Sequence, residues 1–180
     1  MNPLLKKVIR NEHQLQKYTQ LTQLASQVES GVIVELGTYL GYGTIALCEG
    51  SQVPVYTVDD YTPKTGWAGE FYGPKDIQVF HRNCDEANVK PTLLMGDAGE
   101  VADEIKRFYG VEYPVSFLFW DLGIPARLCE DFEAWQSHIT GKFVIHDTDD
   151  NRLGSDLLNP VGWEKRKEGV FWILERLKTG

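Results

Sequence analysis

The sequence predicts an α/β fold: a doubly wound, mostly parallel sheet with an antiparallel hairpin at its C-terminal edge and a helix at its N-terminus. Five short apolar segments rich in β-branched and aromatic residues carry this prediction, at 32–36, 55–58, 92–95, 115–120 and 143–146. Segments this apolar fit strands that are buried on both faces. Helical segments alternate with them, which indicates βαβ units.

The first element expected is a helix that ends before Gly31. Apolar residues recur there at three- and four-residue steps, at Leu15, Tyr18, Leu21, Leu24, Ala25 and Val28. The helices between the strands are expected at 44–49, 76–88, 100–108 and 127–136. Residues 163–167 and 170–177 read as two strands joined by a tight turn, which gives the edge hairpin.

One segment, 60–74, fits neither pattern, because it holds three glycines, two prolines and four aromatic residues. Two interpretations stand side by side. The segment is a binding loop above the strand ends, or it is a surface loop whose aromatic side chains fold back on the core.

No linker, repeat or low-complexity segment divides the chain. A single domain over residues 1–180 is therefore expected, with a helical cap at 1–30, a cofactor-binding core at 31–150 and the edge hairpin at 160–178.

The charge balance narrows the classes of partner. Lysine and arginine number 18 against 26 acidic residues, a net charge of −8. Without basic clusters, nucleic acid and an anionic membrane are not expected as partners. The longest apolar run, 170–174, is far short of the about 20 residues of a membrane helix. Three widely spaced cysteines without a CxxC motif favour reduced thiols and a cytoplasmic protein.

A glycine-rich loop follows the first predicted strand. Glycines at 37, 41 and 43 stand between that strand and a helix, the context in which such a loop lets a ligand approach the backbone. Glu35 lies two residues before the first glycine, where a carboxylate would repel a pyrophosphate and would suit a cationic amine or a hydroxyl.

Two further acids end the next two strands. Asp59 lies 22 residues past Gly37, and Asp60 follows it, so an acid is available for ribose hydroxyls. Asp97 ends the third strand. Three acids on successive strand ends predict a pocket for a cationic adenosine ligand, which S-adenosylmethionine fits better than NAD.

The segment VIVELGTYLGYGTIALCEG resembles the cofactor loop of class I S-adenosylmethionine-dependent methyltransferases, and the small O-methyltransferases of the catechol and caffeoyl-CoA type in particular. VYTVDD, LLMGDAGEV, VSFLFWDLG and GKFVIHDTDD resemble the later motifs in order, so the likeness covers about residues 31–150. The resemblance implies a Rossmann-like fold and methyl transfer to a small-molecule acceptor, most readily at a hydroxyl oxygen.

The resemblance also implies residue roles. Glu35 would organise the loop and its water, and Asp121 would lie under the methionine end of the cofactor and face the substrate. Asp59, with Asp60 as second choice, would hold the ribose, and Asp97 with the backbone at Ala98 would lie beside the adenine. The residues implied to line the methionine portion are Gly37, Thr38, Tyr39, Gly41 and Gly43.

Chemistry is expected at the ends of the fourth and fifth strands. In cation-dependent relatives two aspartates there bind a divalent ion, so Asp121 and Asp147 are the candidate ligands of a magnesium ion. The sequence departs from that pattern at Thr148, for which Asp149 or Asp150 could substitute, and at Ile124, where some relatives carry a lysine. The use of a metal is therefore left open.

His146 has two interpretations, as a general base and as a structural histidine that points away from the pocket. No special role is expected of His13, His81 or His138.

Two other functions stay open: a module that binds the cofactor without chemistry, and a different nucleotide-dependent enzyme on the same fold. A short-chain dehydrogenase is disfavoured because no tyrosine has a lysine four residues later. The oligomeric state is left open, a homodimer included, and the sequence does not identify the acceptor.

Overall fold

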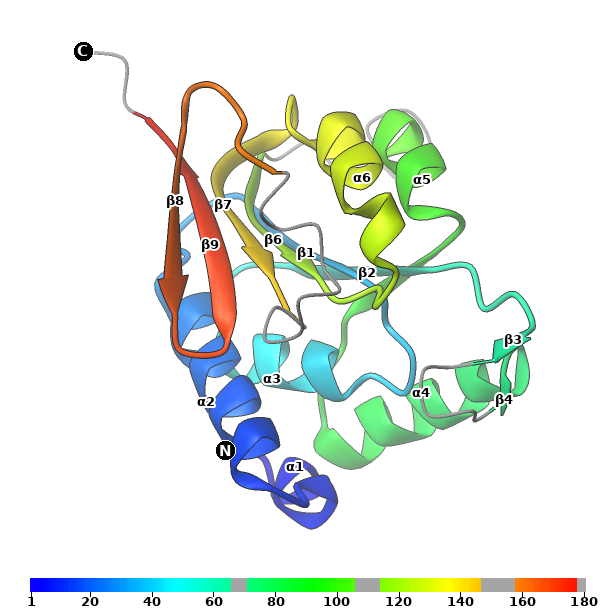
Figure 1. The fold of residues 1–180 in the computed structure, drawn as a ribbon. Coiled ribbons are helices and arrows are strands. Elements are labelled where there is room, and N and C mark those ends of the chain that lie inside the picture. Colours follow the sequence, from blue (N-terminus) through cyan, green and yellow to red (C-terminus); the bar gives the residue numbers. More distant parts are fainter. Residues whose placement is uncertain (66–70, 106–113, 147–157, 178–180) are drawn as a thin grey trace.

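The predicted fold class is confirmed by a computed structural model, which describes residues 1–65, 71–105, 114–146 and 158–177. A seven-stranded sheet has the order β5-β2-β1-β6-β7-β9-β8 and forms the middle layer (Figure 1). Five strands run parallel: β1 (Val32–Leu36), β2 (Val55–Asp59), β5 (Thr92–Met95), β6 (Val115–Trp120) and β7 (Ile139–Ile145). The edge hairpin of β8 (Trp163–Glu168) and β9 (Phe171–Arg176) pairs antiparallel to β7.

Helices cover both faces of the sheet. On one face lie α5 (Ala98–Glu104) and α6 (Leu128–Trp135), the latter preceded by the short helix η1 (Pro125–Arg127). The helices α1 (Pro3–Val8), α2 (Glu12–Ser26) and α3 (Tyr42–Gly50) pack on the other face, and α4 (Lys75–Ala87) adds Ala87 to the same cluster. The central strand β1 is buried along its whole length, because its alternate side chains enter the two separate cores.

The N-terminal segment differs from the single helix that the periodicity predicts. The extra helix α1 begins after Asn2, whose side chain accepts a hydrogen bond from the backbone nitrogen of Leu4, with Pro3 at the first helical position. In α2 the buried residues are Tyr18, Leu21, Leu24 and Ala25, whereas Leu15 is exposed. The apolar stripe is therefore shorter than expected.

Other boundaries shift by a few residues. The strand β7 begins at Ile139, four residues before the expected start, because Ile139 and Lys142 already pair with Val115 and Phe117 of β6, on either side of an irregularity in the register. The predicted helix at 100–108 begins at Ala98, and its last residues lie outside the described part of the chain.

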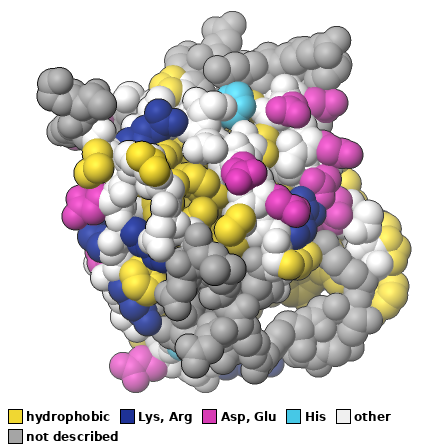
Figure 2. All heavy atoms as spheres, turned by 45° about the horizontal axis from the view of Figure 1, so that its top comes forward, with side chains coloured by type: hydrophobic (Ala, Val, Ile, Leu, Met, Phe, Trp, Pro, Cys, Tyr) yellow, Lys and Arg dark blue, Asp and Glu magenta, His cyan; other side chains and the backbone are white. Residues whose placement is uncertain are grey.

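Acidic side chains gather on the face that α5 and α6 present to solvent (Figure 2). The exposed acids of these two helices are Glu100, Asp103, Glu104, Glu130 and Glu133. Across the described residues no helix is long and apolar enough to pass through a membrane.

Candidate functional site

The loop between β1 and α3 depends on two glycines. Gly37 and Gly41 have φ angles of +98° and +84°, which glycine adopts at little cost. A Cβ atom at Gly37 would lie 2.6 Å from the carbonyl oxygen of Asp121, so the loop runs directly against the backbone that follows β6. At Gly41 a Cβ would lie 2.7 Å from the Phe80 ring of α4. Both glycines are thus required by the protein's own packing.

Asp59, the last residue of β2, holds this loop in place. Its Oδ2 atom accepts hydrogen bonds from the backbone nitrogens of Thr38 (2.9 Å) and Tyr39 (3.0 Å), and its Oδ1 atom accepts one from Tyr61 N (2.9 Å). The side chain is buried. The carboxylate expected to hold the ribose is therefore also the anchor of the glycine loop, and its ribose role stays a prediction.

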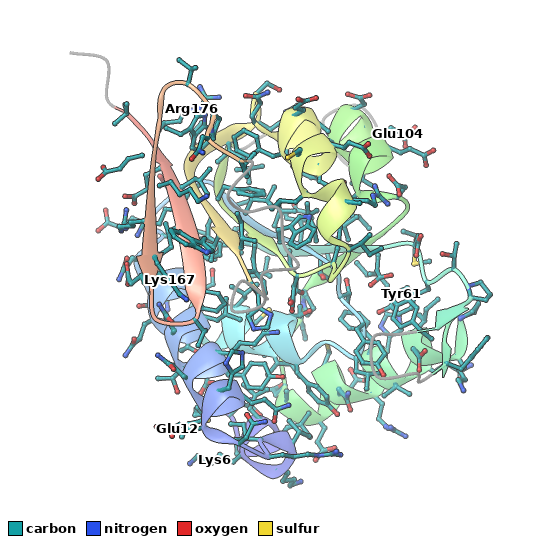
Figure 3. All side chains as sticks on the ribbon, in the orientation of Figure 1. Lys6, Glu12, Tyr61, Glu104, Lys167 and Arg176 are labelled. Atoms are coloured by element: carbon teal, nitrogen blue, oxygen red, sulfur yellow. The ribbon has the colours of Figure 1, made fainter. Side chains whose placement is uncertain are left out.

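A cluster of three tyrosines covers the loop. The Tyr61 and Tyr72 rings are stacked with centroids 5.8 Å apart, and the Tyr39 and Tyr72 rings lie at 5.2 Å. The Tyr61 hydroxyl donates to the Tyr39 carbonyl oxygen (2.8 Å), and burial raises the pKa of both Tyr61 and Tyr72. Tyr61 lies beside the small hairpin of β3 (Lys64–Thr65) and β4 (Phe71–Tyr72) (Figure 3).

The described aromatic side chains of segment 60–74 do not all follow one of the two interpretations. Tyr61 and Tyr72 fold back against the glycine loop, whereas Phe71 remains 60% exposed. Trp67, with the rest of 66–70, lies outside the described residues.

Glu35 lies behind the glycine loop and is fully buried. Its Oε2 atom accepts hydrogen bonds from the hydroxyls of Thr44 and Thr57, the latter at 2.8 Å, and Thr57 lies 2.5 Å from the Thr38 hydroxyl. Within the described part of the chain its Oε1 atom has no hydrogen-bond partner, and a Cβ at Gly43 would lie 2.3 Å from it. Burial raises the pKa of Glu35 to about 8, although the two threonine hydroxyls oppose the shift.

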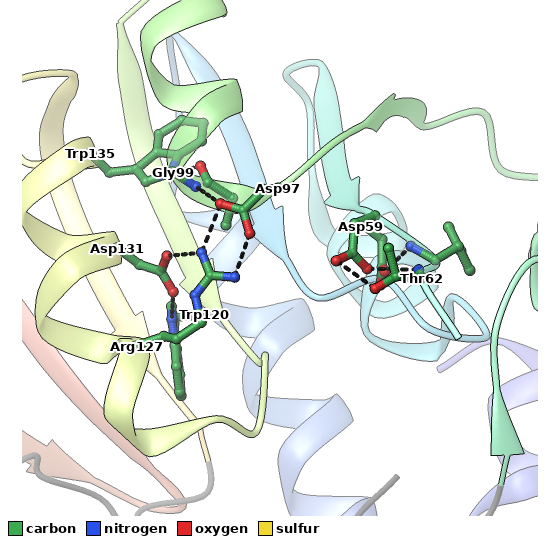
Figure 4. A network of polar contacts seen from close by, with 11 residues as sticks. Asp59, Thr62, Asp97, Gly99, Trp120, Arg127, Asp131 and Trp135 are labelled. Atoms are coloured by element: carbon green, nitrogen blue, oxygen red, sulfur yellow. Dashed lines mark hydrogen bonds and ion pairs between the residues drawn. The ribbon is translucent and has the colours of Figure 1, made fainter. Parts of the chain in front are cut away.

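Asp97 ends the β5 turn and caps α5. Its Oδ1 atom accepts from Gly99 N (3.0 Å), and the Arg127 guanidinium donates to both carboxylate oxygens, at 2.5 and 2.8 Å (Figure 4). Arg127 also donates to Asp131, which accepts from the Trp120 indole (2.9 Å). The hydrogen bonds from Arg127 lower the pKa of Asp97. The carbonyl oxygen of Ala98 accepts from the Trp135 indole (2.8 Å).

The candidate ribose and adenine residues line one narrow crevice at the carboxyl ends of β2, β5 and β6. Asp60, whose side chain accepts from the backbone nitrogen and hydroxyl of Thr62, lies on the same wall. The lining residues are Val58, Asp59, Asp60, Gly96, Asp97, Ala98, Leu122, Ile124 and Arg127. Of the three acids that the sequence places at successive strand ends, Asp59 and Asp97 line the crevice, whereas Glu35 is buried behind the loop and does not. Arg127 is an addition that no motif indicated.

A second cluster lies where β6 and β7 end. Asp121 and His146 follow these adjacent strands, and the Nδ1 atom of His146 is 2.8 Å from Asp121 Oδ1. From α2, Lys17 reaches the same carboxylate with its Nζ atom 2.7 Å from Oδ2. His13 Nε2 lies 3.3 Å from His146 Nε2. We call these four residues the α2 cluster.

The electrostatics of the α2 cluster keep Asp121 ionised. Burial alone would raise the pKa of Asp121, but Lys17 and His146 outweigh burial and hold it at about 2. His146 is buried and its Nδ1 atom faces Asp121, a hydrogen-bonded position that both interpretations of this histidine allow. His13, for which the sequence predicts no special role, lies against the His146 ring.

Lys17 was missed because a lysine on an amphipathic helix carries no motif. Asp147, the second predicted metal ligand, and residues 148–150 lie outside the described residues. Among the residues that are described, no group of three or more His, Cys, Asp or Glu side chains could hold a metal ion.

A hollow wider than the crevice lies elsewhere on the described surface. It opens at the amino ends of β6 and β7, between the end of α2 and the edge hairpin, and includes Leu24, Ser116 and Lys142. None of the sequence-predicted site residues lines it.

The buried acid Glu35 leads to a prediction about stability. The folded protein holds a proton on Glu35 up to about pH 8, whereas the unfolded chain releases it near pH 4.5. Rising pH between these values therefore favours the unfolded state, by up to about 1.4 kcal/mol per pH unit. Relative to Glu35→Gln, the free energy of unfolding of the unmodified protein should fall over this interval and level off above it.

Urea unfolding at several pH values measures this difference. The variant of an exposed acid, Glu29→Gln, should keep the slope of the unmodified protein. Parallel curves for the unmodified protein and Glu35→Gln would contradict the protonated state of Glu35.

Of the comparisons with known proteins, the one with solved structures identifies the fold. No protein-family model matches the chain, and no curated protein matches its sequence. Among solved structures, an O-methyltransferase from Bacillus cereus in complex with S-adenosylhomocysteine is similar with a TM-score of 0.64 at 18% identity, over 97% of this chain and 84% of that one.

Two further structures are similar over nearly the whole chain. A putative caffeoyl-CoA O-methyltransferase from Staphylococcus aureus has a TM-score of 0.66 at 14% identity, over 95% of this chain and 85% of that one. The O-methyltransferase TomG from Streptomyces achromogenes, in complex with S-adenosylmethionine, has a TM-score of 0.65 at 15% identity, over 99% of this chain and 91% of that one. The chain therefore has the Rossmann-like fold of class I methyltransferases.

Proposed function

We propose that the protein transfers a methyl group from S-adenosylmethionine to a hydroxyl oxygen of a small-molecule acceptor. The observation that carries this proposal is that the glycine loop, the crevice and the α2 cluster lie together at the carboxyl edge of the sheet. There the glycine loop anchored by Asp59 and the crevice containing Asp97 adjoin the α2 cluster at the ends of β6 and β7. Two of the similar solved structures are O-methyltransferases in complex with S-adenosylhomocysteine and S-adenosylmethionine, respectively.

The residues present suit an adenosine ligand with a cationic centre. The crevice combines apolar walls with the carboxylates of Asp59, Asp60 and Asp97, which accept hydrogen bonds from hydroxyl and amino groups. Arg127 fixes the orientation of Asp97, and the Gly37–Gly41 turn brings backbone groups rather than side chains toward the ligand. When bound, the cofactor supplies an electrophilic methyl group on sulfur.

His146 is the proposed proton acceptor. With its Nδ1 atom hydrogen-bonded to Asp121, the neutral ring can take a proton at Nε2, where an acceptor hydroxyl would displace the Nε2 atom of His13 that lies 3.3 Å away. The acceptor hydroxyl would give its proton to the imidazole while its oxygen forms the new bond to the methyl carbon. The carbon–sulfur bond breaks at the same time, and its electron pair stays on sulfur.

Cofactor binding tests the first half of the proposal. S-adenosylhomocysteine should bind one to one in isothermal titration calorimetry, and NAD and ATP should not. Asp59→Ala removes both a charged acceptor and the anchor of the loop, so affinity should fall about 10- to 100-fold. Asp60→Ala removes a neighbouring acid that accepts hydrogen bonds from Thr62, and the affinity should fall much less. Equal losses at the two positions would contradict the role given to Asp59.

Turnover tests the second half and separates an enzyme from a binding module. The formation of S-adenosylhomocysteine is measured with a panel of hydroxylated acceptors. His146→Asn should lower kcat by about 10²- to 10⁴-fold and leave the affinity for S-adenosylhomocysteine nearly unchanged. The matched control is His81→Asn, an exposed histidine on α4. Full activity of His146→Asn would exclude His146 as the base.

A further inference from the structure

The resemblance makes Asp121 a candidate ligand of a divalent ion, a use that the sequence leaves open, and the described residues around Asp121 do not fit such an ion. Both oxygens of this carboxylate are engaged, Oδ1 by His146 at 2.8 Å and Oδ2 by the Lys17 ammonium at 2.7 Å. Magnesium requires near-octahedral oxygen coordination at about 2.0–2.1 Å. An ion at Oδ2 would have to displace the ammonium, with which it could not share the carboxylate without strong charge repulsion.

Lys17 is held firmly in this position. Its side chain is 13% exposed and that of Asp121 is 16% exposed, so the ion pair is largely shielded from solvent. The Nζ atom also lies 3.3 Å from His146 Nδ1 and 5.9 Å from the centre of the Phe119 ring. Because the pair is mostly buried, its separation would leave an uncompensated charge at a cost of several kcal/mol. This ion pair therefore differs from a solvent-exposed ion pair, which water and salt weaken.

From this arrangement we propose that Lys17 takes the place of the metal ion in the acceptor site. This inference rests on the proposed methyl transfer and adds the group that makes the acceptor oxygen reactive. The ammonium lies on the Nδ1 side of the base, so its electrostatic field, and not a direct contact, stabilises the negative charge that develops on the acceptor oxygen as His146 takes its proton at Nε2. The acceptor class that follows is a hydroxylated small molecule whose oxygen needs one cationic neighbour, without two adjacent oxygens to chelate a metal.

The fold explains how a lysine from the N-terminal cap reaches this site. The α2 helix packs across the sheet face, in the core shared with β1, β6 and β7, so one turn of it passes the ends of β6 and β7. Ile124, where some relatives carry a lysine, is 36% exposed and lines the crevice instead. The positive charge is thus supplied by a different element of the chain.

Direct metal binding is the first arm of the test, and it needs no acceptor. Mn²⁺ is titrated into the full chain saturated with S-adenosylhomocysteine and followed by electron paramagnetic resonance. We expect no Mn²⁺ binding below about 1 mM that depends on Asp121. Binding below that concentration that is lost in Asp121→Asn would overturn the proposal, whereas binding that survives this substitution lies at another site and supports it.

The second arm measures turnover with the acceptor on which the unmodified protein is most active. Lys17→Met keeps the length of the side chain and removes its charge, so kcat should fall about 10²- to 10³-fold. S-adenosylhomocysteine affinity should stay within about threefold. Lys17→Arg, which keeps the charge, should recover part of the rate. Chelator should change neither activity nor affinity.

Lys7→Met is the matched control, because Lys7 is also ion-paired at 2.7 Å but is 66% exposed, and its partner is Glu86 of α4 and not a residue of the α2 cluster. Unchanged kcat in a folded Lys17→Met protein, or activity abolished by chelator and restored by Mg²⁺, would overturn the proposal. Failure of the methyl-transfer proposal itself looks different: the unmodified protein would then bind no S-adenosylhomocysteine or turn over no acceptor.

Discussion

The carboxylate of Asp59 is the contact on which the site depends. A carboxylate has two oxygens, and here they accept three backbone N–H groups, from Thr38, Tyr39 and Tyr61. Hydrogen bonds to an ionised acceptor are the stronger kind. This single side chain therefore ties the end of β2 to the glycine loop after β1 and to the start of the tyrosine-bearing segment. Without it, the backbone N–H groups of the loop would lose the hydrogen bonds that stabilise its left-handed conformation.

Each acid along the carboxyl edge of the sheet is stabilised in its own way. Asp97 is paired with Arg127, Asp121 with Lys17 and His146, and Asp59 with backbone amides. Glu35 alone lies behind the loop with two hydroxyl donors, and burial raises its pKa. Four carboxyl groups can share one edge because three have cationic or amide partners and the fourth is held largely in its neutral form.

Much of this architecture could be predicted from local pattern. Strands buried on both faces read as apolar runs, and the glycine loop and the acids at strand ends follow from their place next to those runs. The position of Lys17 beside Asp121 could not be predicted, because the two residues are 104 positions apart in the chain and meet only through the packing of α2 across the sheet. The pairing of Arg127 with Asp97 likewise requires α6 and α5 to lie side by side. Sequence spacing gives no information on such contacts between elements.

The central claim is that the carboxyl edge of the sheet binds the cofactor, and that the wide hollow at the amino ends of β6 and β7 does not. Backbone amide chemical shifts in a ¹H–¹⁵N correlation spectrum, recorded with and without S-adenosylhomocysteine, test this claim residue by residue. The account predicts large changes at Thr38, Tyr39, Gly96 and Ala98, and none at Lys142 or Glu164, which line the hollow. Changes confined to Lys142, Glu164 and their neighbours would contradict it.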